Sequence, residues 1–72
     1  MDTDYVFGDP YAITRDDTDH HEPRYVTLGR DALGAVLVVV WTLPYGSDKP
    51  RVISARKASR NERETYAQGM QP

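Results

Sequence analysis

The sequence predicts an α+β domain in which four antiparallel strands form a meander and a short helix follows them. Segments with strand-like patterns recur at short intervals, and turn-forming residues separate them. The period of the apolar residues then changes near Ser59, as at the start of a helix. Short connections favour antiparallel neighbours. With 72 residues, the chain makes one domain at most.

Strand patterns cover four segments, at residues 11–15, 24–29, 35–43 and 50–55. The first follows Gly8-Asp9-Pro10, a breaker because proline fixes φ and disfavours helix at the residue before it. The second alternates polar and apolar side chains. The third is apolar on both alternating faces, which indicates a covered central strand with Trp41 in the core. The fourth begins at Pro50, where a missing donor is tolerated.

A helix is predicted from Ser59 to Gln68. Ser59 and Glu62 have the spacing of a capping box, in which each side chain bonds the other residue's backbone N–H. Gly69 then stands where a left-handed C-terminal cap belongs. One short helix cannot cover both faces of a four-stranded sheet. We therefore expect a further covering segment beyond this chain.

Charge is distributed unevenly along the chain, although its net value is only −2. Residues 1–22 carry seven acids and one base, whereas residues 49–66 carry six bases and two acids. A basic end can attract a polyanion despite the overall sign. From charge alone, a solvated helix face together with an acidic loop is the favoured interpretation.

Composition excludes several classes of protein. There is no cysteine, which excludes a disulfide, a thiolate metal site and a cysteine nucleophile. The first residues are acidic and lack the apolar core of a signal peptide. The longest apolar run, residues 35–41, is too short to span a bilayer. We expect a cytoplasmic protein with no membrane partner.

Four segments resemble the BrnT toxin family in wording, order and spacing: VFGDP at 6–10, RYVTLGRDALG at 24–34, VLVVVWT at 36–42 and RVISARKASRNERETY at 51–66. The last is the most specific, because the family typically reads Arg-Ile-Ile-Ser-Ala-Arg-Lys-Ala-Thr-Arg before a helix with Glu-Arg and Tyr. The resemblance covers essentially the whole chain.

The resemblance implies a RelE-like fold and a ribonuclease toxin that cleaves RNA and inhibits translation. It implies a BrnA-like antitoxin partner, whose ribbon-helix-helix domain binds DNA, so that operator DNA is reached only through the antitoxin. The resemblance also implies catalysis without a metal or a cofactor, because RelE-like enzymes look as though they rely on basic side chains.

The sequence departs from the family pattern in two places. Family members have a strand and a helix before VFGDP, so residues 1–72 are expected to form a single toxin domain truncated at its N-terminus. Leu43-Pro44-Tyr45 follows Thr42, where a polar or basic residue is common. Both departures bear on activity more than on fold. The alternatives are therefore an inactive toxin that only binds the antitoxin, as a binding module or decoy, and a non-functional remnant.

Cleavage of RNA to a 2′,3′-cyclic phosphate requires proton transfer and stabilisation of the phosphorane charge. Arg56 and Lys57, at the end of the fourth strand, are the first catalytic candidates, because a guanidinium binds phosphate bidentately. The alternative is a solvated basic turn. Arg51 is also a candidate, but regular alternation places it on the opposite face from Arg56 unless the strand bends near Ala55.

Helix residues Arg60 and Arg63 share a face, which suggests a groove for the RNA backbone. Pairing of Arg60 with Glu64 is the alternative. Tyr66 extends this face and could stack on a base, or it could pack against the sheet.

His20 is a candidate proton-transfer residue, since histidine titrates near neutral pH. The family often has Asp-His followed by an acid and an arginine here, which adds Glu22 and Arg24 as candidates, the latter for substrate binding. A metal site is weaker, because the two adjacent histidines have no recognisable ligand spacing. A polar surface loop is the remaining alternative.

Overall fold

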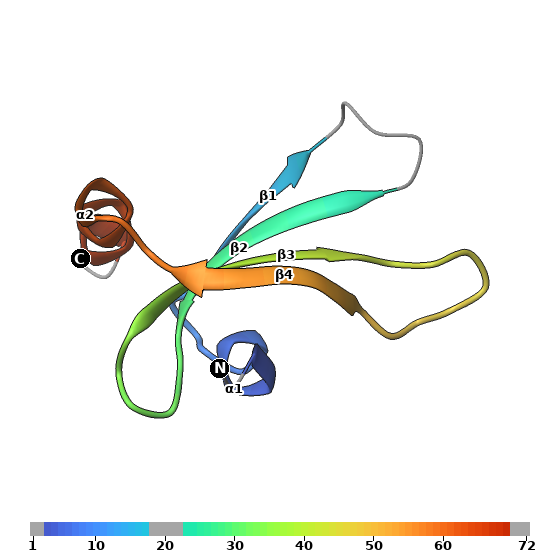
Figure 1. The fold of residues 1–72 in the computed structure, drawn as a ribbon, viewed down its shortest axis with the longest axis horizontal. Helices are drawn as coiled ribbons and strands as arrows, with labels where there is room; N and C mark the ends of the chain where they lie inside the picture. Colours follow the sequence, from blue (N-terminus) through green and yellow to red (C-terminus); the bar gives the residue numbers. More distant parts are fainter. Residues whose placement is uncertain (1–2, 18–22, 70–72) are drawn as a thin grey trace.

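The computed structural model describes residues 3–17 and 23–69. Its elements follow in the order α1 (Thr3–Phe7), β1 (Ile13–Asp17), β2 (Arg24–Arg30), β3 (Val36–Thr42), β4 (Arg51–Lys57) and α2 (Arg60–Gly69) (Figure 1). The strands form one antiparallel sheet in the order β1-β2-β3-β4. The predicted α+β class, with a meander followed by a helix, is confirmed.

Three local features differ from the predictions. The helix α1 was not predicted. β1 starts at Ile13 rather than at residue 11, because the Asp9 carboxylate accepts from Tyr11 N (2.9 Å) and the Asp9 carbonyl accepts from Ala12 N (3.1 Å), which forms a turn. The predicted left-handed cap at Gly69 is wrong: Gly69 is helical, and within the described ranges positive φ occurs at Gly34 and Gly46.

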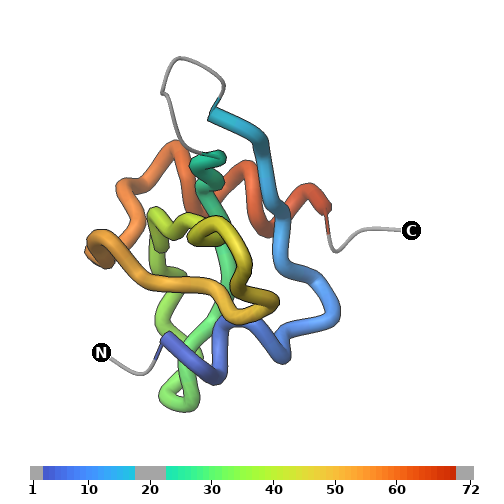
Figure 2. The backbone as a smooth tube through the Cα atoms, turned by 90° about the vertical axis from the view of Figure 1, so that its right-hand side faces the viewer, coloured from blue at the N-terminus to red at the C-terminus, as the bar shows by residue number. Residues whose placement is uncertain are grey.

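Cross-strand partners lie on the same face of a sheet, so the register divides the side chains into two sets. The α1 face comprises Thr14, Asp16, Tyr25, Thr27, Gly29, Leu37, Val39, Trp41, Val52, Ala55 and Lys57. The α2 face comprises Ile13, Arg15, Asp17, Arg24, Val26, Leu28, Arg30, Val36, Val38, Val40, Thr42, Arg51, Ser54 and Arg56. Figures 1 and 2 show the two helices on different sides of the strands, and each covers part of one face.

The hydrophobic core lies on the α1 face. Val6 of α1 is fully buried together with Leu37 and Val39 of β3. Gly29 permits this packing, since a Cβ there would lie 2.7 Å from Val6 Cγ1. Trp41 packs against the cluster, as predicted, and its ring meets Phe7 edge-on and stacks with Tyr25, at centroid distances of 5.5 and 4.5 Å.

Polar groups on this face are satisfied within the sheet. The indole N–H of Trp41 donates to Thr27 Oγ1 at 2.8 Å, and Thr27 Oγ1 also bonds Thr14 Oγ1 at 2.8 Å. Thr27 can therefore be buried without the cost of an unpaired hydroxyl.

Asp9 joins the N-terminal segment to α2. Its Oδ2 accepts from the backbone N–H of Arg30 (2.9 Å) and from the Tyr66 hydroxyl (2.5 Å), while the Arg30 guanidinium lies over the Tyr66 ring. Burial, followed by the bond to Asp9, raises the pKa of Tyr66 to about 12. No helix among the described residues is long and apolar enough to cross a membrane.

Candidate functional site

A β-bulge in β4 decides which arginines share a face. Val40 pairs with Ser54 and Trp41 pairs with Val52, so Ile53 has no partner in β3. Such an extra residue reverses the alternation on its strand. Arg51 therefore lies on the same face as Arg56. The prediction that they lie on opposite faces assumed regular alternation and is wrong, because the irregularity occurs at Ile53.

Five arginines of the strands lie on the α2 face, and one of them, Arg30, lies over the Tyr66 ring. Arg24 is opposite Thr42, which is opposite Arg51, and Arg56 is opposite Val38. Arg15 of β1 is opposite Val26 on the same face. Sequence reasoning did not single out Arg15, because it stands alone among acidic residues. Only the register of β1 against β2 brings it to the other arginines.

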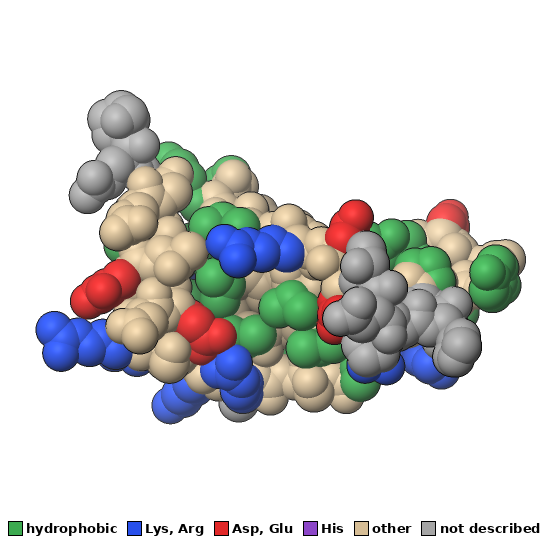
Figure 3. Space-filling view, turned by 90° about the horizontal axis from the view of Figure 1, so that it is seen from above, with side chains coloured by type: hydrophobic (Ala, Val, Ile, Leu, Met, Phe, Trp, Pro, Cys, Tyr) green, Lys and Arg blue, Asp and Glu red, His purple; other side chains and the backbone are tan. Residues whose placement is uncertain are grey.

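A groove lies between this face of the sheet and the start of α2, with Arg15 in its lining and Arg56 opposite Val38 of its floor. It has a volume of about 230 Å³ and an apolar floor formed by Ile13, Val26, Leu28 and Val38. Arg15 and three helix residues, Asn61, Glu62 and Thr65, form its polar rim. The space-filling view shows hydrophobic side chains beside basic and acidic ones near the end of the molecule that carries α2 (Figure 3).

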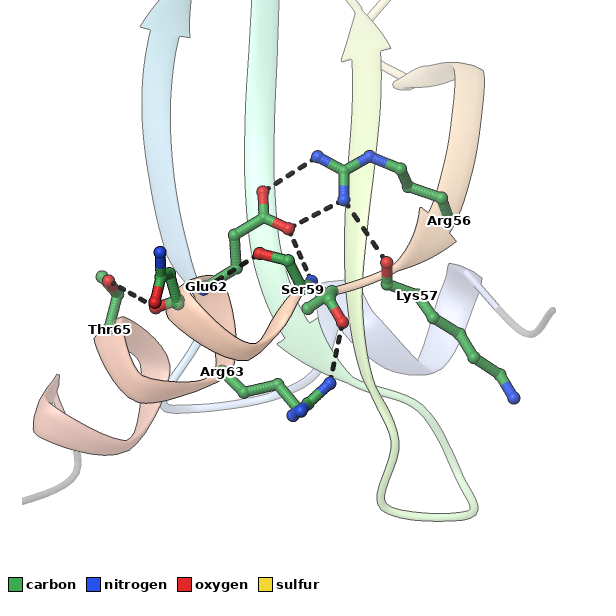
Figure 4. Close-up of polar contacts among 8 residues, drawn as sticks. Arg56, Lys57, Ser59, Glu62, Arg63 and Thr65 are labelled. Atoms are coloured by element: carbon green, nitrogen blue, oxygen red, sulfur yellow. Dashed lines mark hydrogen bonds and ion pairs between the residues drawn. The ribbon is translucent and has the colours of Figure 1, made fainter.

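Glu62 connects the capping box to Arg56 (Figure 4). Its Oε1 accepts from Ser59 N (2.7 Å), and Glu62 N donates to Ser59 Oγ (3.3 Å), so the predicted capping box is confirmed. The same carboxylate receives two guanidinium bonds from Arg56, at 2.7 and 2.9 Å. Sequence reasoning missed this second role.

The ion pair changes the protonation of Glu62. The hydrogen bonds from Arg56, and then from Ser59 N, lower the pKa of Glu62 to about 2. Glu62 is therefore a carboxylate at neutral pH and a poor proton acceptor. The pKa of Arg56 is raised by the same bonds, and its side chain remains 59% exposed. Arg56 can thus meet a ligand while it is held from one side.

Residues 1–62 match a family model described as a ribonuclease toxin, BrnT, of a type II toxin–antitoxin system. The chain belongs to the BrnT family. The matched range includes all five strand arginines of the α2 face and ends at Glu62. Family membership implies RNA as the substrate class and an antitoxin as the partner. A comparison with curated proteins finds no match to this chain.

The other predicted site residues of this BrnT chain lie apart from the arginines of the α2 face. Lys57 is opposite Leu37 on the α1 face, and Figure 4 shows its side chain directed away from Glu62. Arg60 pairs with Glu64 at 3.5 Å, the alternative considered above. Arg63 donates to the carbonyl of Ala58 at 3.1 Å.

Tyr66 is 1% exposed, so its ring is not accessible for stacking on a base. Tyr66 therefore packs within the fold, and its predicted role in binding a base is wrong. His20 and Glu22 lie outside the described residues. Within ranges 3–17 and 23–69, no three or more acidic, histidine or cysteine side chains come together as a cation site.

Proposed function

We propose that this BrnT chain is the endoribonuclease toxin of a type II toxin–antitoxin pair. It would cleave RNA in the cytoplasm and so inhibit translation, as one toxin domain over residues 1–72. A BrnA-like antitoxin with a ribbon-helix-helix domain would neutralise it and would connect it to operator DNA. The observation that carries the proposal is that Arg15, Arg24, Arg51 and Arg56 lie on one face of the sheet, with Arg15 lining a groove and Arg56 opposite Val38 of its floor.

The chemistry follows from the demands of RNA cleavage. The 2′-hydroxyl loses its proton, its oxygen attacks the phosphorus, and the 5′-oxygen leaves with a proton, which yields a 2′,3′-cyclic phosphate. Arg51 and Arg56 would bind the phosphate and stabilise the charge that develops on the phosphorane. Glu62 is too weak a base for the first step. His20 remains the predicted proton-transfer residue.

The test compares neighbouring basic residues on opposite faces. Purified protein would be incubated with RNA and with translating ribosomes, and cleavage would be quantified. Arg51→Ala and Arg56→Ala are expected to lower the cleavage rate by about tenfold or more, as for loss of a charge-stabilising donor. Lys57→Ala is the matched control and should retain most of the activity. Absence of cleavage by the wild-type chain on and off ribosomes would refute the proposal.

A second function is favoured by the Arg56–Glu62 pair. Two N–H groups of Arg56 are directed at a carboxylate, which competes with phosphate. The chain could then be a binding module that holds the antitoxin without cleaving RNA. This function would be favoured over the first if the chain captures the ribbon-helix-helix antitoxin, leaves RNA intact and allows normal growth on expression.

A further inference from the structure

We infer that the groove between α2 and the sheet binds the base of one unpaired RNA nucleotide, with Arg15 and Arg56 holding phosphates beside it. The inference rests on the proposed ribonuclease function. It names the substrate as single-stranded RNA and identifies Asn61 as the residue that contacts the edge of the base.

The composition of the groove matches the chemistry of a nucleobase. Four aliphatic side chains form its floor: Ile13, Val26, Leu28 and Val38. A base has two apolar π faces and a polar edge, so it can lie on an apolar floor while its edge meets a polar rim. The volume of about 230 Å³ leaves room for a small planar group.

One rim residue has an uncommitted polar group. The backbone carbonyl of Asn61 accepts from Thr65 Oγ1 at 3.1 Å, but the Asn61 side-chain amide has no partner among the described residues. An amide offers both a donor and an acceptor, which is the pair needed at the edge of a base. Glu62, by contrast, is already occupied by Arg56 and Ser59 N.

Charges flank the groove on both sides. Arg15 lies on edge strand β1 and is exposed, with no ion pair within residues 3–17 and 23–69. Arg56 lies on the other edge strand, β4, beside the same floor through its partner Val38. A nucleic-acid backbone could therefore cross the strands with a phosphate near each arginine. A base can enter the groove only when it is unpaired and unstacked, which excludes duplex RNA.

The test uses short RNA oligomers with 2′-O-methyl groups, which lack the attacking hydroxyl and cannot be cleaved. Binding is measured by fluorescence anisotropy. Thr65→Trp, which fills the groove from its rim, is expected to weaken binding about tenfold, the loss of one base contact. Ala67→Trp, on the exposed part of the same helix, is the matched control and should bind within about twofold of wild type. Thermal melts establish that both variants fold.

A second variant keeps the inference falsifiable if Thr65→Trp does not fold. Asn61→Ala is expected to reduce the difference in affinity among the four homopolymers, because it removes the contact with the base edge. An oligomer without bases should bind wild type about tenfold more weakly than one with bases.

Three results would overturn the inference: equal binding of duplex and single strand, equal binding with and without bases, or unchanged RNA binding by Thr65→Trp with loss of antitoxin capture. The last would assign the groove to a protein partner. If the protein cleaves unmodified RNA but binds oligomers equally well with and without bases, base binding in the groove is refuted and the proposed function stands. If binding depends on the bases but unmodified RNA is not cleaved, base binding in the groove stands and the proposed ribonuclease function is refuted.

Discussion

The two faces of the sheet share the central strand β3, but different side chains pack around β3 on each face. On the α1 face, Leu37 and Val39 are buried beneath Val6, and the polar groups of Trp41 and Thr27 bond one another. On the α2 face, Val38 is also buried, but its partner on edge strand β4 is the charged Arg56, and a groove remains open beside it. The pattern of β3 is the same for both faces, so its neighbours decide that one becomes a core and the other a site.

The largest expected effect tests whether the α1 face carries the stability. Leu37→Ala should lower the free energy of unfolding by about 2–5 kcal/mol, since it removes a fully buried side chain and leaves a cavity. A domain of this size has only about 3–5 kcal/mol from its core. The measurement is urea denaturation followed by circular dichroism.

Leu33→Ala is the matched control for this prediction. Leu33 is 93% exposed, so the same chemical change should alter stability by no more than about 0.5 kcal/mol. Equal losses at both positions would mean that the α1 face is not the core.

A smaller effect is expected where α1 meets the sheet. Gly29→Ala should destabilise the fold by about 1–3 kcal/mol, because the new Cβ would overlap Val6 Cγ1 at 2.7 Å. Gly8→Ala is the control, since its nearest atom is 3.6 Å away. The two melting temperatures would be compared. If Gly29→Ala has the same melting temperature as wild type, α1 does not approach β2 this closely.

The smallest effect belongs to the exposed ion pair on the α2 face. The pKa of Glu62 is lowered from 4.5 to about 2, mainly by Arg56. Its contribution to stability is therefore complete above pH 4.5 and is lost as pH falls towards about 2. The difference in melting temperature between wild type and Glu62→Gln should shrink through this window.

An NMR titration of the Glu62 carboxyl carbon measures the same pairing directly. The midpoint should be near 2 in wild type and should move towards 4.5 in Arg56→Ala. A wild-type midpoint already near 4.5 would mean that the pair does not form, and Arg56 would then be unrestrained beside the groove.

Predictions from the sequence succeeded where a local pattern is sufficient. The apolar run of β3 identified a central strand, and the spacing of Ser59 and Glu62 identified the capping box. The start of β1 was misplaced, because the carboxylate of Asp9 forms a turn that extends over Tyr11 and Ala12. The five residues of α1 are too few for a helical period to be recognised.

The candidate site was predicted only in part. Arg51, Arg56 and Arg24 were named, but Arg51 was assigned to the wrong face, and Arg15 was not singled out. Tyr66 was offered as a binding residue and instead lies buried against Asp9. Each of these outcomes depends on a partner far away in the sequence.

The sequence by itself determined which segments form strands, where α2 begins and the family to which the chain belongs, because these depend on neighbouring residues and on short motifs. The tertiary structure alone decided which arginines share a face. A strand's pairing register and the bulge at Ile53 arise from hydrogen bonds between strands, and a shift of one residue moves a side chain to the opposite face.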